Sequence, residues 1–152
     1  GAWIKSLYDL MIEGTVLLID YGMTEAEYFH PQRNQGTLKC FSKHNSSDNP
    51  FIQIGKQDIT ASVNFSNIAS IAMESGFNVS GYTTQSMFLI SLGIDSYLKN
   101  EENEEKKVKI AQEIKQLVLP GAMGEVFKVM ALSKKQSVKL EGFKELDLTH
   151  RL

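Results

Sequence analysis

The side chains best suited to chemistry lie near the predicted ends of strands in the first half of the sequence. They are Asp20, Tyr21, Arg33, His44, Asp58 and Thr60. Asp20 directly follows an apolar run, which places it at the carboxyl end of a buried strand, where α/β sheets bind their ligands. The same carboxylate could instead tie down the following loop, and the sequence favours neither reading. For Arg33, an ion pair with Asp20 or Asp58 is favoured over a ligand clamp.

A metal or nucleophile site is a second kind of chemistry to consider. His30, Cys40, His44 and Asp48 fall within one polar stretch, but their spacing matches no zinc-binding pattern. Cys40 and His44 as a nucleophile and base lack a third group to orient them. We favour hydrogen bonding within the loop and predict no metal site.

A phosphate-binding or dinucleotide-binding turn is the third kind. Such turns need glycines between a strand and a helix, because backbone N–H groups must approach the ligand closely. The sequence has no G-x-G motif and no P-loop, and the glycines of Gly121–Gly124 follow a predicted helix. We therefore predict that this chain holds no cofactor-binding residues of its own.

Composition sets the class of protein. The chain has 152 residues, a formal net charge of −2 and 42% hydrophobic residues, which is typical of a globular protein. The length suits one domain, 1–152. The charge gives no drive toward nucleic acid or an anionic membrane, so neither is an expected partner. No apolar run is long enough to span a bilayer, and no signal peptide is visible. The single cysteine favours a reducing compartment. The first residue is not methionine, and a processed terminus or a cut from a longer protein would each explain this.

Hydrophobic periodicity then gives the elements of the first half. A helical pattern over 2–12 ends at Gly14, and a buried strand follows over Thr15–Ile19. Residues 23–57 show no sustained period and are expected to form a long polar loop, with a short strand over Thr37–Phe41.

Alternating residues predict a strand over Asp58–Phe65, which places the side chains of Asp58, Thr60 and Ser62 on one face. A helix then runs to Gly76, with Asn64 as its N-cap. Another strand is predicted over Phe77–Thr84.

The second half is predicted to insert helices between two strands. A buried helix is predicted over Gln85–Ile94, and a charge run follows over 99–109. Together with the stretch up to Pro120, these two segments form a predicted helical insertion, 85–120. The charge run reads as a solvated helix face with ion pairs Glu102–Lys106 and Glu105–Lys109. The last strand is predicted over Gly124–Ser133.

Several short motifs together resemble a known family. They are "IDYG" (Ile19–Gly22), "RNQGTL" (Arg33–Leu38), His44 after "CFSK", "GKQDIT" (Gly55–Thr60), "TQSMFLISLGI" (Thr84–Ile94), "LVLPGAMGEVFKVMALSK" (Leu117–Lys134) and "LEGF" (Leu140–Phe143). In this order and spacing they are similar to the MidA family of S-adenosylmethionine-dependent class I methyltransferases. That family comprises bacterial and mitochondrial proteins related to the complex I assembly methyltransferase. The resemblance covers nearly the whole chain but only the C-terminal part of the family's length.

The resemblance implies an α/β fold, the C-terminal part of a Rossmann-like methyltransferase sheet. Thr15–Ile19 would be its fifth strand, Phe77–Thr84 its sixth and Gly124–Ser133 an antiparallel seventh. The S-adenosylmethionine site of the family would lie upstream of Gly1. A protein arginine is the implied methyl acceptor, and Asp20 and Asp58 are the candidates to orient its guanidinium.

The resemblance also leaves alternatives open. Ser62 stands where the family commonly has histidine, which puts activity in doubt. The chain could therefore be an inactive remnant that acts as a dimerisation or partner-binding module, and alone it is expected to be inactive. A half sheet would leave the edge of the fifth strand unpaired, so we expect a homodimer or association through that edge. The family implies the bacterial cytoplasm or the mitochondrial matrix.

Overall fold

The computed structural model describes residues 1–43, 45–136 and 139–152. Its α-helices are α1 (Ala2–Leu10), α2 (Glu25–Tyr28), α3 (Phe65–Ser75), α4 (Gln85–Ser91), α5 (Ser96–Lys99), α6 (Glu104–Val118) and α7 (Met123–Val126). Its strands are β1 (Gly14–Met23), β2 (Lys39–Ser42), β3 (Asn45–Ser47), β4 (Asp58–Thr60), β5 (Val63–Asn64), β6 (Asn78–Thr84) and β7 (Phe127–Lys134). Two short 3₁₀ helices, η1 (Glu141–Phe143) and η2 (Thr149–Arg151), lie near the C-terminus.

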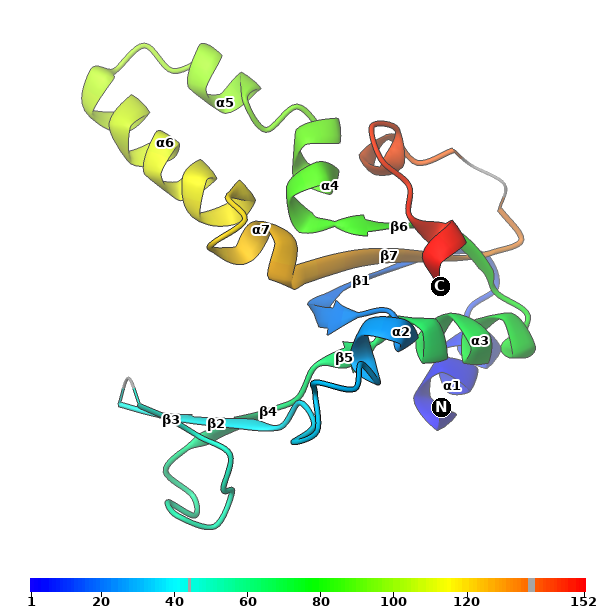
Figure 1. Cartoon of the computed structure of the whole chain (residues 1–152). Helices are drawn as coiled ribbons and strands as arrows, with labels where there is room; N and C mark the ends of the chain where they lie inside the picture. Colours follow the sequence, from blue (N-terminus) through cyan, green and yellow to red (C-terminus); the bar gives the residue numbers. More distant parts are fainter. Residues whose placement is uncertain (44, 137–138) are drawn as a thin grey trace.

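The central sheet has four strands in the order β5-β1-β7-β6 (Figure 1). β7 runs antiparallel to both β1 and β6, so β1 and β6 point the same way. The antiparallel direction predicted for the last strand is therefore confirmed. On the outer edge of β1, only Gly22 and Met23 have a described partner, the parallel strand β5.

One face of this sheet carries the main hydrophobic core. α1 and α3 pack on it, and buried residues from four elements and the α3–β6 junction meet there: Ile4, Phe65, Ala69, Ala72, Phe77, Tyr82, Met130 and Leu132. α3 begins where its sequence predicts, because the Asn64 side chain accepts a hydrogen bond from the Asn67 N–H. It ends at Gly76, whose φ of 103° is a left-handed conformation that favours glycine.

The other face is covered only in part. Val129 and Ala131 of β7 are buried there under Phe143. Gly81 of β6 admits that ring, because a Cβ at this position would lie 2.5 Å from Phe143 Cδ2. Over β1 the same face has no cover in the described structure, and the side chains of Leu17 and Ile19 are 43% and 50% exposed.

The segment 23–57 is not a continuous loop. It contains α2, β2 and β3, and β2 pairs with β3 and β4 in a separate three-stranded sheet, β3-β2-β4. In Figure 1 this sheet projects below and to the left of the central sheet as an arm, which we define as residues 38–60. The strand predicted over Thr37–Phe41 corresponds to β2, shifted by a residue or two.

The predicted strand Asp58–Phe65 is broken in two. β4 belongs to the arm, whereas β5 joins the central sheet beside β1. A period of two identifies extended chain but does not say which sheet each part joins, and Asn64 also caps α3. Ser62 lies between the strands, so it does not share a continuous strand face with Asp58 and Thr60.

The predicted boundaries of other elements also change. Gly14 does not end the first helix: Met11 is its C-cap, and Gly14 begins β1 with a φ of 135°. Gly124 lies in α7 rather than in the last strand, where its hydrogen-only side chain lets it pack against the Val118 carbonyl group. The predicted helix Gln85–Ile94 ends at Ser91.

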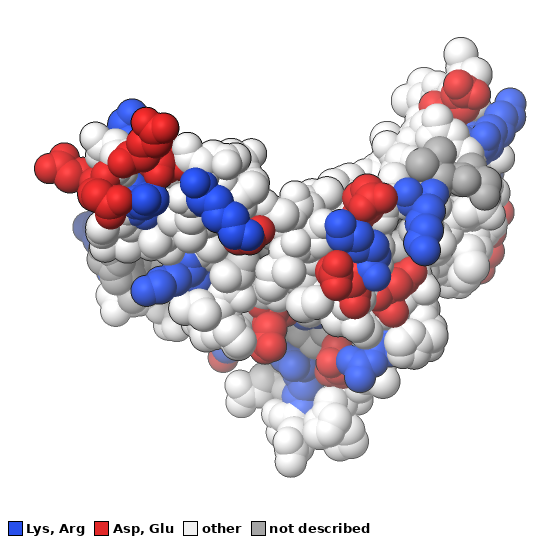
Figure 2. Space-filling view, turned by 90° about the horizontal axis from the view of Figure 1, so that it is seen from above, with Lys and Arg blue, Asp and Glu red and all other residues white. Residues whose placement is uncertain are grey.

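The helical insertion presents mixed charge. α6 starts at an Asn103 cap, and its ion pair joins Lys107 to Glu104 at 2.9 Å. The predicted pairs Glu102–Lys106 and Glu105–Lys109 are wrong, since neither is among the ion pairs of the described residues and Glu102 precedes the helix. Figure 2 shows acidic and basic side chains interspersed on the upper surface, with acidic ones gathered at the left end over α5 and the start of α6. No helix of the described chain is long and apolar enough to cross a membrane.

Candidate functional site

Near the carboxyl end of β1, Asp20 and Tyr21 are exposed to solvent. They lie inside the strand, which continues to Met23 instead of ending at Ile19 as predicted. The Asp20 Oδ1 atom accepts a hydrogen bond of 2.7 Å from the Tyr21 N–H. This carboxylate therefore bonds to the backbone of its own strand, and no ion pair of Asp20 is found among the described residues. The Tyr21 ring packs on Phe127 with centroids 4.2 Å apart and remains 42% exposed. Lys128 of β7 lies directly opposite Asp20 in the strand register.

Gly22 allows the next segment to lie close to this strand end. A Cβ at Gly22 would lie 2.6 Å from both Phe65 Cδ2 and the Val63 carbonyl oxygen, so only glycine permits β5 and α3 to approach. α2 then follows β1 after a single residue, Thr24. The Glu25 N–H donates to Ser66 Oγ at 2.9 Å, which fastens α2 to α3.

A capping box fixes the carboxylate of Glu27 on α2. The backbone N–H and the hydroxyl of Thr24 both donate to Glu27 Oε2, at 3.1 and 3.3 Å. This arrangement follows from the Thr-x-x-Glu spacing of Thr24 and Glu27. This Thr-x-x-Glu spacing was the sequence signal for Glu27, a residue that is not among the predicted site residues.

Two further side chains interact with Glu27 electrostatically, and sequence reasoning missed both. Burial lowers the pKa of the Lys128 ammonium, while the negative charges of Glu27 and Glu125 act in the opposite direction. The Lys128 Nζ donates to the carbonyl of Glu125. Burial also raises the pKa of the Tyr82 phenol, and the Glu27 carboxylate raises it further. The sequence signal for Lys128 was its position as a lysine next to the apolar run of β7.

The Tyr82 hydroxyl has no hydrogen-bond partner in the described structure, although the side chain is only 1% exposed. We expect Tyr82→Phe to leave the free energy of unfolding at neutral pH unchanged or raised by about 1 kcal/mol, because it removes an unpaired buried polar atom. Above about pH 10 the unfolded tyrosine ionises while the folded one keeps its proton, so the wild type loses stability as pH rises. The variant lacks this loss. Urea unfolding at pH 7 and at pH 11 measures both effects, and equal pH dependence of the two proteins would contradict the assignment.

Arg33 lies beside α2 but forms a different contact from the one predicted. Its Nε donates to the Glu27 carbonyl oxygen at 3.3 Å. No ion pair of Arg33 with Asp20 or Asp58 is found among the described residues, so the predicted pairing is wrong. Arg33 lines a polar hollow of about 370 Å³ with Glu27, His30 and Gln32.

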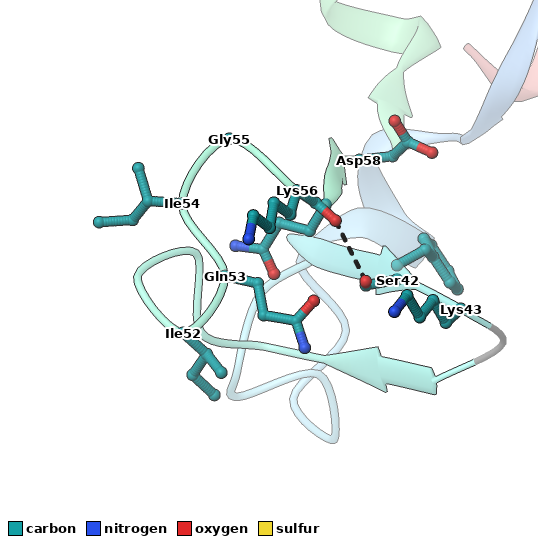
Figure 3. A pocket seen from close by; sticks show the side chains of 10 residues that line it. Ser42, Lys43, Ile52, Gln53, Ile54, Gly55, Lys56 and Asp58 are labelled. Carbon is teal, nitrogen blue, oxygen red and sulfur yellow. Dashed lines mark hydrogen bonds between the residues drawn. The ribbon is translucent and has the colours of Figure 1, made fainter.

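Asp58 and Thr60 lie in the arm, on β4, where they pair with Phe41 and Lys39 of β2. Asp58 borders an open hollow of about 980 Å³ at the end of the arm. Figure 3 shows the Ser42 hydroxyl bonded to the Lys56 carbonyl, and Ile52 and Ile54 are among the residues that line this hollow. His44 lies outside the described residues.

The six predicted residues thus fall into separate regions. Asp20 and Tyr21 belong to the central sheet, Arg33 to the segment after α2, and Asp58 and Thr60 to the arm. Around the end of β1, the structure instead gathers Asp20 and Lys128, opposed in register, with Glu27, which interacts with Lys128 and Tyr82. This set can bind or orient a charged group.

The described residues do not form a nucleotide cradle or a metal centre. The described glycines with positive φ do not form a glycine-rich turn between a strand and a helix. The N-terminus of α2 is already bonded to Glu27, a carboxylate that would repel a phosphate. Within residues 1–43, 45–136 and 139–152, no three His, Cys, Asp or Glu side chains lie close enough to hold a metal ion.

Comparison with known families identifies the chain. Residues 1–83 match the family described as "Putative S-adenosyl-L-methionine-dependent methyltransferase". The chain belongs to this methyltransferase family. A comparison with curated proteins finds no match.

Two crystal structures from Burkholderia thailandensis share this methyltransferase fold. One is a COG1565 superfamily member bound to S-adenosyl-homocysteine, with 35% identity and a TM-score of 0.94 over 99% of this chain. The other is a native structure of a protein of the same superfamily, with 35% identity and a TM-score of 0.95 over 99% of this chain. The chain spans only 40% and 41% of the lengths of these neighbours. The cofactor of the family is S-adenosylmethionine.

Proposed function

We propose that this chain is the acceptor-side, C-terminal portion of a MidA-type protein methyltransferase whose acceptor is an arginine side chain. The observation that carries the proposal is the solvent-exposed Asp20 near the carboxyl end of β1, in a member of a methyltransferase family. The small share of the neighbours' length that the chain spans supports the idea that the cofactor is held by another part of the protein.

The chemistry of methyl transfer suits this division. S-adenosylmethionine supplies an activated methyl group, so the protein contributes mainly by holding the acceptor in line. The guanidinium of arginine is planar and always protonated in water. A carboxylate beside it can accept two parallel N–H bonds, which both orient the group and offset its charge. Asp20 on the central sheet and Asp58 on the arm are the two proposed carboxylates, and because they lie in separate regions each is tested by itself. Tyr21, Arg33, His44 and Thr60 are proposed as further acceptor-side residues.

The test replaces each acid in the longer protein that contains this chain. Asp20→Asn and Asp58→Asn are each expected to lower methyl transfer to an arginine-containing substrate about tenfold or more, because a charge-assisted contact is lost. Asp95→Asn is the matched control, since Asp95 is an exposed acid paired with Lys99 on the helical insertion. Radiolabelled methyl transfer is measured beside cofactor binding. Unchanged transfer by both variants would reject the two carboxylates as acceptor residues.

A second function is favoured by the exposed face of β1. Leu17 and Ile19 are half exposed, and together with Trp3 they line a hollow of about 520 Å³ along the outer edge of the strand. Such a surface suits an inactive remnant that serves as a dimerisation or partner-binding module. Loss of the family histidine at Ser62 agrees with this alternative. Absence of methyl transfer by the longer protein, together with stable association of this chain, would favour it.

A further inference from the structure

The loop at the end of the arm exposes apolar side chains that the fold does not use. It joins β3 to β4, and we define this tip loop as residues 48–57. In Figure 1 it forms the lowest part of the molecule, far from the central sheet. Phe51, Ile52 and Ile54 are 76%, 63% and 76% exposed. Because they fall within one short stretch of the loop, they form a small apolar surface at its tip, of the kind that marks a contact with another molecule.

Polar bonds, rather than these apolar side chains, hold the tip loop in shape. The Phe51 N–H donates to Asn49 Oδ1 at 2.9 Å. The Ser42 hydroxyl of β2 donates to the Lys56 carbonyl oxygen at 3.1 Å, which ties the far side of the loop to the arm's sheet (Figure 3). The loop is therefore ordered before any contact forms, and a preorganised surface loses less conformational entropy on binding.

Two lysines border the apolar surface. Lys43 and Lys56 line the same hollow as Ile52 and Ile54 (Figure 3), and both lysines are exposed. Neither forms an ion pair within the described part of the chain. Apolar side chains with unpaired ammonium groups beside them complement the surface of an anionic bilayer, in which negative headgroups lie over hydrocarbon.

The charge of the whole chain does not oppose this match. The expectation that no membrane is a partner rests on the net charge of −2, but a charge acts over only about 8–10 Å at physiological ionic strength. The arm's described charges are those of Lys39, Lys43, Asp48, Lys56 and Asp58, and Lys39 is paired with Asp48 at 2.6 Å. The other two lysines outnumber Asp58. The acidic side chains gathered over α5 and the start of α6 lie above the central sheet in Figure 1, whereas the arm lies below it.

The size of the tip loop favours a bilayer over a protein partner. A specific protein interface uses about 20–30 residues on each side, whereas the tip loop comprises only residues 48–57. Insertion into a bilayer has no such threshold, because each apolar side chain that leaves water contributes by its own area. We propose that the tip loop inserts its three apolar side chains into the surface of an anionic lipid bilayer, while Lys43 and Lys56 contact the lipid headgroups. This contact is independent of the proposed methyl transfer.

Flotation of this chain with lipid vesicles tests the proposal. The vesicles consist of phosphatidylcholine alone or of phosphatidylcholine and phosphatidylglycerol in equal amounts. We expect the chain to bind the anionic vesicles, and to bind the neutral vesicles about tenfold more weakly or less, because neutral vesicles present no net charge to the lysines. Binding to anionic vesicles should weaken as salt is added, since salt screens that attraction. Absence of binding to the anionic vesicles would overturn the proposal.

The double variant Ile52→Ser, Ile54→Ser removes most of the apolar surface. It is expected to weaken binding to anionic vesicles about tenfold or more. Its melting temperature should equal that of the wild type, because both side chains are exposed. The matched control is Leu10→Ser with Ile12→Ser, which makes the same kind of change at residues that are 82% and 81% exposed before β1. Equal binding by the tip variant and the wild type, or an equal loss in the control, would contradict insertion by the tip loop.

The double variant Lys43→Gln, Lys56→Gln tests the electrostatic part. It is expected to remove most of the preference for anionic vesicles and most of the salt dependence. Lys106→Gln with Lys109→Gln is the matched control, since these are exposed lysines of α6, and it should keep both. An unchanged preference in the tip variant would reject the two lysines as headgroup contacts.

Sedimentation velocity without lipid distinguishes a protein contact from a bilayer contact. The variant Ile52→Ser, Ile54→Ser should self-associate as the wild type does, because the tip loop is not proposed to meet a second copy. If the variant instead loses self-association and keeps its binding to vesicles, the tip loop contacts another copy of this chain and the proposal fails.

Discussion

Replacing Gly22 with alanine is expected to lower the free energy of unfolding by about 2–3 kcal/mol, through overpacking at a fixed backbone contact. The added Cβ would lie 2.6 Å from the Val63 carbonyl oxygen and 2.6 Å from Phe65 Cδ2. The carbonyl cannot rotate away as a flexible side chain can, because β5 pairs with β1 at this position. Phe65 is 1% exposed and belongs to the main core, so it has little room to move.

Urea unfolding monitored by circular dichroism measures this effect. Gly121→Ala is the matched control, because no atom lies within 4 Å of the Cβ it would add and its φ lies outside the left-handed region. That variant should stay within about 0.5 kcal/mol of the wild type. A similar loss for both variants would mean that the contact between β1, β5 and α3 is not as tight as the structure has it.

Local sequence signals predicted the elements that depend on neighbouring residues alone. α3 lies where the sequence predicts it, because its cap and its stopping glycine act within one turn of the chain. The apolar runs of β1 and β7 mark strands for the same local reason, although the ends of both were displaced. The prediction that β1 is buried is wrong for one of its faces, where Leu17 and Ile19 are half exposed.

Pairing partners could not be read from local patterns. The run Asp58–Phe65 has one continuous alternation, yet β4 and β5 join different sheets. Which sheet each half joins depends on contacts with other segments: β4 pairs with β2 in the arm, and β5 approaches β1 where Gly22 has no side chain. Both β2 and Gly22 are distant in sequence from the run Asp58–Phe65, which is divided between the two sheets.

The candidate site shows the same limit. Asp20 was identified because an apolar run is a local feature, although β1 continues past Asp20 to Met23. Its opposition to Lys128 depends on the register between β1 and β7. Glu27 interacts with Lys128 and Tyr82 across separations of 101 and 55 residues, as their numbering gives. Arg33 was predicted to pair with the side chain of Asp20 or Asp58, but its Nε donates to the backbone carbonyl of Glu27. Long-range contacts therefore determine which of the polar residues act together.

Replacing Ile19 with lysine is expected to abolish self-association of this chain, which we propose forms a symmetric dimer through the outer edge of β1. Ile19 is 50% exposed and lies beside Leu17 on the uncovered face of that strand. Open apolar strand edges pair with other chains, and a lysine at the edge prevents this by placing an ammonium in the interface. We expect the dimer dissociation constant to rise about a hundredfold or more, which corresponds to about 3 kcal/mol.

The control for Ile19→Lys is Ile12→Lys, which makes the same chemical change at an 81% exposed residue between α1 and β1. Sedimentation velocity over a range of concentrations should give a dimer for wild type and Ile12→Lys and a monomer for Ile19→Lys. A wild-type chain that stays monomeric at high concentration would contradict the proposed dimer. A longer protein that contains this chain, as proposed above, would give a further distinction. If its remaining residues cover the edge of β1, it should not associate through Ile19, and the edge then serves the methyltransferase fold rather than a separate binding module.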